Sequence, residues 1–146
     1  MPVFQKTFRV KTRGHCQVMD VTSEVNRIVG ASRLRQGIVN VSGKGSTLGI
    51  TTIEYEPGAL ADLLRALEQI APMNAEYAHN ERWGDGNGYA HLRAALLKPD
   101  LCVPIRAGKL ALGTWQQIIL IDFDNRPRQR QVVLTVTAAS QSVPRS

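Results

Sequence analysis

The chain has 146 residues, of which 43% are hydrophobic and 21% charged. This balance predicts one globular domain over residues 1–146 and excludes a chain that is disordered throughout. No apolar run approaches the ~20 residues of a membrane span, and the first ten residues lack a signal-peptide core, so we expect a cytoplasmic protein without a membrane partner. Neither cysteine belongs to a CxxC motif, which excludes a zinc site built on paired cysteines.

The formal net charge of +6 raises the question of nucleic-acid binding. The charge is +6 over residues 1–44, −4 over residues 45–125 and +4 over residues 126–146. The positive charge therefore lies at the two ends of the chain, away from the candidate catalytic and binding residues in the middle. Aromatic residues make up only 5% of the chain, and no basic stretch is interleaved with aromatics, so the pattern argues against nucleic acid as a partner.

Alternating and helical patterns succeed one another along the chain. Strands are predicted over residues 4–10, 15–21, 38–41, 50–55, 101–105, 110–115, 118–123 and 132–137, from apolar alternation or, over 38–41 and 118–123, from short continuous apolar runs. A helix is expected to start at Thr22 or Ser23 and to stop before Gly37. The clearest helical stripe, Leu60, Leu63, Leu64, Leu67 and Ile70, follows Pro57-Gly58 and ends at Pro72.

This order predicts an α+β fold of mainly antiparallel sheet with two main helices. Residues 74–88 are expected to form a long polar loop, with a short helix over residues 89–97. A loop of that length inside a compact domain usually has a function. The tail from about residue 139 is expected to be loose.

The long loop carries the strongest candidate site. His79 and His91 flank Asp85, which lies in a glycine-punctuated stretch, and imidazole is the side chain best suited to proton transfer near neutral pH. Asp85 could orient an imidazole, act as a base or bind a metal. His79, Asp85 and His91 are also acceptable ligands for zinc, manganese or iron, with positions left for water. The expected cofactor is a divalent metal, magnesium or zinc. The alternative is that these side chains bond one another or lie on the surface of a glycine-rich turn.

A second candidate is the small, flexible segment over residues 43–47. It is not a Walker A motif, but its glycines, Ser46 and Thr47 offer donors that suit a phosphate. Arg93 could clamp an anion in bidentate fashion or form an ordinary ion pair. Gln116 interrupts an apolar stretch and is expected to have a specific hydrogen-bonding partner.

The order of these motifs resembles the YjbQ-type family, which is often labelled secondary thiamine-phosphate synthase. The resemblance rests on a series of segments spread over most of the chain: Gly45-Ser46-Thr47, Ile50-Thr51-Thr52-Ile53-Glu54, Tyr77-Ala78-His79, Asp85-Gly86-Asn87-Gly88, His91-Leu92-Arg93-Ala94 and Leu112-Gly113-Thr114-Trp115-Gln116-Gln117.

The resemblance implies a compact α+β sandwich, a homotrimer and a transferase that joins a pyrimidine pyrophosphate to a thiazole phosphate. The polar positions that match the family's motifs are His79, Asp85, Asn87, His91 and Gln116. We expect catalytic roles for His79, Asp85 and His91. Binding of a small phosphorylated metabolite would fall to Ser46, Thr47, Asn87, Arg93 and Gln116. Two imidazoles common in the family are missing, since residues 44–47 contain no His and Tyr89 replaces a second one. The alternative is therefore a trimer that binds a phosphometabolite, or serves as a scaffold, without catalysis.

Overall fold

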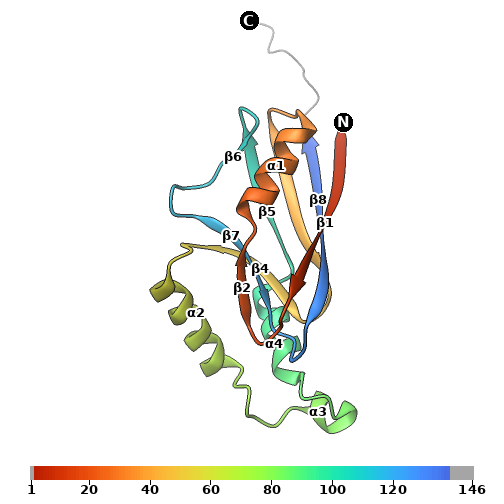
Figure 1. Ribbon diagram of the computed structural model, residues 1–146, viewed down its shortest axis with the longest axis vertical. Helices are drawn as coiled ribbons and strands as arrows, with labels where there is room; N and C mark the ends of the chain where they lie inside the picture. The colour runs from red at the N-terminus through yellow and green to blue at the C-terminus, as the bar shows by residue number, and fades with distance from the viewer. Residues whose placement is uncertain (1, 139–146) are drawn as a thin grey trace, which may run out of the picture.

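The computed structural model describes residues 2–138, and the tail predicted to be loose lies outside the described residues. Twelve helices and strands follow one another along this part of the chain (Figure 1). In order they are β1 (Val3–Thr12), β2 (Gln17–Asp20), α1 (Thr22–Ser32), β3 (Gly37–Lys44), β4 (Leu48–Ile53), α2 (Pro57–Ile70), α3 (Ala78–Trp83), α4 (Gly88–Leu97), β5 (Asp100–Arg106), β6 (Lys109–Leu110), β7 (Gln117–Asp122) and β8 (Arg128–Ala138). The fold is α+β, as predicted.

All the strand pairs are antiparallel, and they form two sheets. The larger sheet has the order β1-β8-β3-β5-β6, and the smaller one has the order β2-β7-β4. On β8 every second side chain is buried, including Val132, Leu134 and Val136, because one face of the larger sheet packs on the core. The alternation that predicted this strand therefore marks its inward face.

The smaller sheet is the middle layer of the molecule. Ile118 and Leu120 of β7 pack into a core shared with the larger sheet and α1, whereas Ile119 and Ile121 pack toward α2 and α4. A strand covered on both faces has no polar side, which explains the unbroken apolar run of β7.

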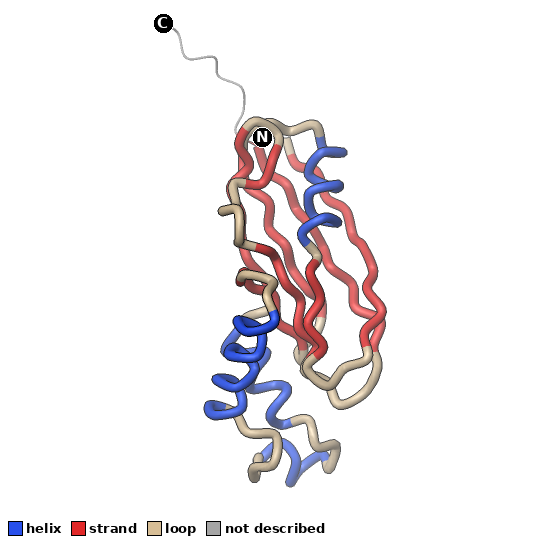
Figure 2. Tube along the Cα trace, turned by 60° about the vertical axis from the view of Figure 1, so that its left-hand side comes forward, coloured by secondary structure: helices blue, strands red, loops and turns tan. Residues whose placement is uncertain are grey.

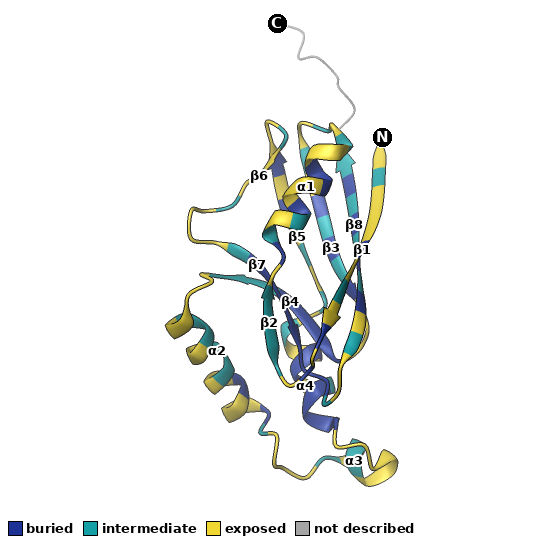
Figure 3. Cartoon of the chain, viewed as in Figure 1, coloured by how far each residue is buried: buried dark blue, intermediate teal, exposed yellow. Residues whose placement is uncertain are grey.

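The helices divide between the two ends of the molecule. α1 lies near one end of the sheets, and α2, α3 and α4 lie at the other (Figures 1 and 2). The Glu56 carboxylate caps α2 by accepting hydrogen bonds from the Gly58 and Ala59 N–H groups, both at 2.8 Å. These bonds lower the pKa of Glu56. α2 buries only Leu67 fully and is largely exposed, unlike α4 (Figure 3).

Two stretches differ from the sequence-based expectation. The expected loop over residues 74–88 contains the six-residue helix α3, and the expected strand over residues 110–115 shrinks to the two residues of β6. α3 is too short to show a helical repeat, and residues 111–116 are irregular. None of the helices within residues 2–138 combines the length and the apolar character that crossing a membrane requires.

Candidate functional site

The turn between α3 and α4 determines where the candidate side chains lie. Gly84 ends α3 in the left-handed conformation, with φ +64°, and Asp85 follows it. Oδ1 of Asp85 accepts a hydrogen bond from the Asn87 N–H at 3.1 Å, and the Asp85 carbonyl accepts one from Nδ2 of Asn125 at 2.6 Å. The turn is thereby fixed to the loop that joins β7 and β8.

Gly88 fixes how close the two helices lie. A Cβ atom at this position would lie 2.5 Å from Cβ and 2.7 Å from Cγ of Tyr77, closer than side-chain atoms can approach. The Gly88 N–H also donates a hydrogen bond to Oδ1 of Asn80 at 2.8 Å. Only glycine therefore allows the start of α4 to approach the start of α3, and this approach brings His79 near His91.

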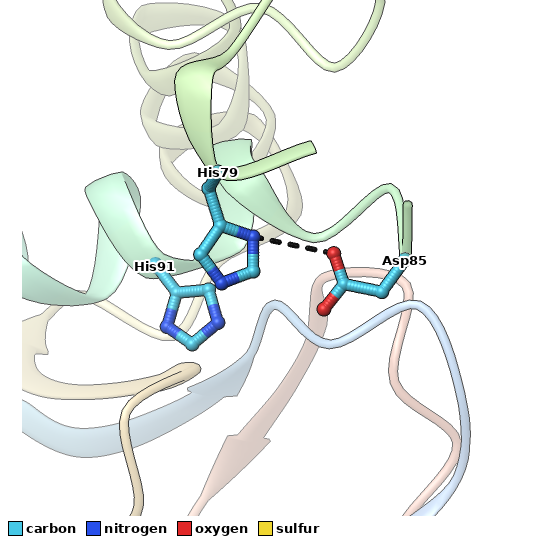
Figure 4. A group of neighbouring side chains, drawn as sticks. All are labelled: His79, Asp85 and His91. Carbon is cyan, nitrogen blue, oxygen red and sulfur yellow. Dashed lines mark ion pairs between the residues drawn. The ribbon is translucent and has the colours of Figure 1, made fainter. Parts of the chain in front are cut away.

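His79, Asp85 and His91 come together at this turn. Their potential ligand atoms all lie within 4.8 Å of one another. Figure 4 shows His79 of α3 placed between His91 of α4 and Asp85. The two imidazole rings have their centroids 4.4 Å apart and are tilted by 40°. All three side chains are accessible to solvent in part, so a ligand can reach them from outside.

Nδ1 of His79 faces the Asp85 carboxylate, with Oδ1 at 3.2 Å. The atom is buried, and it has no aligned hydrogen bond with any residue of the described chain. Buried polar atoms without a partner are uncommon in folded proteins. This one lies in a group of side chains that suit a proton or a metal ion.

A cavity of about 250 Å³ adjoins His91. The turn between β3 and β4 contributes Gly45 and Ser46 to its wall, so the structure brings part of the predicted phosphate loop next to the histidine group. The remaining wall residues are Leu48, Ala94, Ala95 and Pro99. Thr47 is not among them.

Thr47 and Asn87, both predicted to bind a ligand, are buried and hold the fold together. Oγ1 of Thr47 donates a hydrogen bond to Oδ2 of Asp124 at 2.9 Å, and Nδ2 of Asn87 donates to Oδ1 of the same carboxylate at 3.2 Å. Oδ1 of Asn87 accepts from the Asn125 N–H at 3.0 Å. Their polar atoms therefore serve the scaffold beneath the histidines.

Arg93, predicted to clamp an anion, is also buried. Its guanidinium donates hydrogen bonds to the Ala71 carbonyl at 3.0 Å and to the Glu68 carboxylate at 2.5 Å, and Nη1 donates to Sγ of Cys16 at 3.2 Å. Burial raises the pKa of the Cys16 thiol even though Arg93 opposes that shift. Arg93 thus connects α2 to α4, and we assign it no ligand.

Gln116 and Tyr89 also lie outside the histidine group. Gln116 precedes β7 at the end opposite Asp122, where its side chain accepts from the Gly113 N–H at 3.0 Å and donates to Oγ1 of Thr52 at 3.2 Å. Tyr89 is 1% exposed and packs in the core between α4 and β7. Burial raises the pKa of Tyr89, and its hydroxyl has no hydrogen-bond partner within residues 2–138.

Sequence reasoning missed the buried charges beneath the site. Arg130 donates hydrogen bonds from Nε and Nη2 to the Asp122 carboxylate, both at 2.7 Å, and from Nη2 to Oγ1 of Thr47 at 2.6 Å. Asp122 and Asp124 are 0% exposed. The available signal was the spacing: Asp122 and Asp124 alternate with apolar residues, as Arg128 and Arg130 do with Gln129 and Gln131, a pattern that places charges on one strand face.

Comparison with known proteins identifies relatives over nearly the whole chain. A family model described as "UPF0047 protein YjbQ-like" matches residues 6–139. A UPF0047 protein of Archaeoglobus fulgidus is 38% identical over 125 residues, covering 86% of this chain and 94% of the relative. A UPF0047 protein of Methanothermobacter thermautotrophicus is 36% identical over 136 residues, covering 93% of each.

Solved structures show the same fold. A YbjQ-like protein of unknown function from Sulfolobus solfataricus has a TM-score of 0.89 and 30% identity, covering 94% of this chain and 99% of the other. An uncharacterised protein from Clostridium acetobutylicum has a TM-score of 0.82 and 34% identity, covering 90% of this chain and 99% of the other.

These relatives correct the expected activity. The two solved structures are described as uncharacterised or of unknown function, and none of the four descriptions names a thiamine-phosphate synthase or another enzymatic activity. The expectation of a thiamine-phosphate synthase is therefore wrong, whereas a small phosphorylated metabolite as the partner stays a prediction. Arg93, Thr47 and Asn87 use their donors within the fold. The extent of the family match and the level of identity show that this chain belongs to the UPF0047 YjbQ-like family.

Proposed function

We propose that His79, Asp85 and His91 bind a divalent transition-metal ion. The observation that carries the proposal is the convergence of two imidazoles and one carboxylate from separate points of the chain, with ligand atoms within 4.8 Å of one another. Zinc accepts this donor set and binds imidazole nitrogen at ~2.0–2.1 Å. Two ligands on one zinc ion lie at most about 4.2 Å apart, so small side-chain rotations would close the group around the ion.

The donor set favours zinc over magnesium, the two metals expected from the sequence. Imidazole nitrogen suits zinc, iron and nickel, whereas magnesium prefers oxygen ligands in an octahedral arrangement. With one oxygen donor among three side chains, the site resembles three-ligand zinc centres that leave a coordination position for water or a ligand. In such centres the ion supplies Lewis acidity, which polarises a bound oxygen.

Asp85 can support the ion in either of two ways. It can bind the ion directly, or it can accept a hydrogen bond from the Nδ1–H group of His79, 3.2 Å away, and so leave Nε2 of His79 for the metal. In the second arrangement the buried Nδ1 atom gains the partner it lacks. If Asp85 only orients His79, Asp85→Asn should weaken metal binding 10- to 100-fold; if Asp85 binds the ion itself, the loss should be larger.

Calorimetric titration of the metal-free chain with ZnCl₂ and with MgCl₂ tests the proposal. We expect one zinc ion per chain, much weaker binding of magnesium, and at least a hundredfold loss of zinc affinity in His79→Ala and in His91→Ala. His15→Asn is the matched control, because His15 lies in the turn before β2 and Asn accepts its positive φ of 53°. Zinc binding that is equally strong in the His79→Ala/His91→Ala double variant would refute the proposal.

Neither the homotrimer nor the cytoplasmic location expected from the sequence is tested by these observations, and both stay predictions.

A further inference from the structure

The cavity beside His91 lies in a position to hold part of a ligand that reaches the proposed metal. Its volume is about 250 Å³, which is room for roughly eight water-sized groups at ~30 Å³ each. α4 forms one wall with His91, Ala94 and Ala95, and the turn between β3 and β4 forms another with Gly45 and Ser46. Because His91 belongs to both the wall and the metal group, an occupant of the cavity adjoins the metal position.

The walls select for an occupant with a hydrocarbon body. Leu48, Ala94, Ala95 and Pro99 offer only apolar side chains, and Ser46 is the one hydroxyl-bearing residue among the wall residues described. The polar groups of the wall come only from Gly45, Ser46 and His91, so most of an occupant's surface would contact hydrocarbon. Apolar walls gain free energy by covering hydrocarbon surface.

The net charge of the proposed metal centre determines which group of the occupant can bind the ion. A divalent ion held by two neutral imidazoles and one carboxylate keeps a net charge of about +1, so one monoanionic donor neutralises it. A carboxylate is an oxygen donor of that charge and binds zinc well. A dianionic phosphate ester would leave the centre negative.

We propose that the cavity binds a small monocarboxylate whose carboxylate group completes the coordination of the metal and whose hydrocarbon chain lies against Leu48, Ala94, Ala95 and Pro99. The proposal rests on the metal site proposed above. It adds the class of ligand, which must combine one carboxylate with an apolar body of about four to six carbon atoms.

Amide-shift NMR titrations of the zinc-loaded full chain test this proposal with four probes. Pentanoate carries both features, acetate lacks the hydrocarbon body, 1-pentanol lacks the charge, and inorganic phosphate lacks the body and carries more charge. We expect pentanoate to bind at least tenfold more tightly than each of the other three probes. Binding of acetate or phosphate as tight as that of pentanoate would overturn the proposal.

A paired variant locates the binding. Ala95 is exposed on α4 at the cavity wall, and Ala95→Leu would fill the cavity while leaving the buried core unchanged. Ala31→Leu makes the same change at an exposed position of α1, away from the cavity. We expect Ala95→Leu alone to weaken pentanoate binding at least tenfold, with zinc affinity within twofold of the parent.

The outcomes separate the two proposals. Zinc binding without a preference for pentanoate, or with unchanged pentanoate affinity in Ala95→Leu, overturns the carboxylate site and leaves the metal site standing. Failure to bind zinc overturns both. Circular dichroism of Ala95→Leu shows whether the variant is folded, and the probe series on the parent chain decides the proposal independently of that variant.

Discussion

Two polar clusters lie near each other in this molecule, and they differ in how completely their atoms are bonded. In the buried cluster, Asp122 accepts from Arg130 at 2.7 Å and from Oγ1 of Thr12 at 2.5 Å, and Asp124 accepts from Thr47, Asn87 and Arg128. In the histidine cluster, three side chains are partly exposed, and Nδ1 of His79 has no aligned hydrogen bond within residues 2–138.

This difference indicates that the buried cluster stabilises the fold and that the histidine cluster is the one able to bind a ligand. A buried charge is tolerated only when partners surround it, and such partners leave nothing for a ligand. The histidine cluster consists of partly exposed side chains, and it includes an atom, Nδ1 of His79, that a ligand or a reoriented Asp85 can satisfy. Asn87 joins the two clusters, because it bonds to Asp124 and immediately precedes the helix that carries His91.

The largest expected effect comes from breaking the buried cluster. Asp122→Ala leaves the Arg130 guanidinium buried without its main partner, and we expect the free energy of unfolding to fall by about 3–5 kcal/mol. Urea denaturation measures this change. Asp62→Ala removes an exposed ion pair with Arg65, with both side chains 67% exposed, and should change stability by less than about 1 kcal/mol. Equal losses in the two variants would contradict a special role for the buried pair.

Acid should weaken the buried cluster through Asp124. Burial alone would raise the pKa of Asp124, but hydrogen bonds from Thr47, Asn87 and Arg128 outweigh it and lower the pKa below the usual value of 3.8. The ionised group therefore stabilises the fold at neutral pH, and its contribution is lost as the pH falls below that value. Asp124→Asn should cost about 1–3 kcal/mol at pH 7. Denaturation curves should show that the gap between variant and parent narrows toward pH 3; a gap that widens would count against this assignment.

Gly88→Ala should loosen the histidine cluster by pushing α4 away from Tyr77. We expect a loss of about 1–3 kcal/mol in stability, as for other overpacked sites, and at least a tenfold loss of zinc affinity. Gly30→Ala is the control, because a Cβ there meets nothing within 4 Å and alanine favours the helix by up to about 1 kcal/mol. Unchanged zinc affinity in Gly88→Ala would show that the spacing of the two helices does not matter for the site.

The smallest expected effect comes from His79→Ala without metal. His79 is partly exposed and has no aligned hydrogen bond at Nδ1, so its removal should change stability by less than about 1 kcal/mol. Zinc at 100 times its Kd should stabilise the parent by about 2.7 kcal/mol and the variant by almost nothing. Thermal unfolding with and without ZnCl₂ measures both. A large loss of stability in the metal-free state would show instead that His79 stabilises the fold, as the buried cluster does.

Local patterns predicted the sheets and the long helices, because burial on one face leaves a regular repeat. The stripe from Leu60 to Ile70 gave α2, and alternation gave β8. α3 has no repeat to read, since its position depends on the contact of Asn80 with Gly88. The prediction of a strand over residues 110–115 was wrong because this segment is an irregular, mostly exposed turn whose apolar residues resemble a strand in sequence.

The candidate site was predictable in part for a different reason. Residue types pointed to His79, Asp85 and His91, and the structure places these three side chains together. The roles given to Arg93, Thr47 and Asn87 depend on partners distant in the chain, such as Ala71 and Asp124. No spacing rule reveals whether a polar side chain faces a ligand or a carbonyl of its own backbone.

The order of the larger sheet has a consequence for synthesis on the ribosome. β8 lies between β1 and β3, and β1 pairs with it from Val3 opposite Thr137 to Thr12 opposite Arg128. β1 therefore has no pairing partner until β8, the last strand within residues 2–138, has been synthesised. Contacts so distant in the chain close slowly, and until then β1 and β3 expose unpaired edges to other nascent chains.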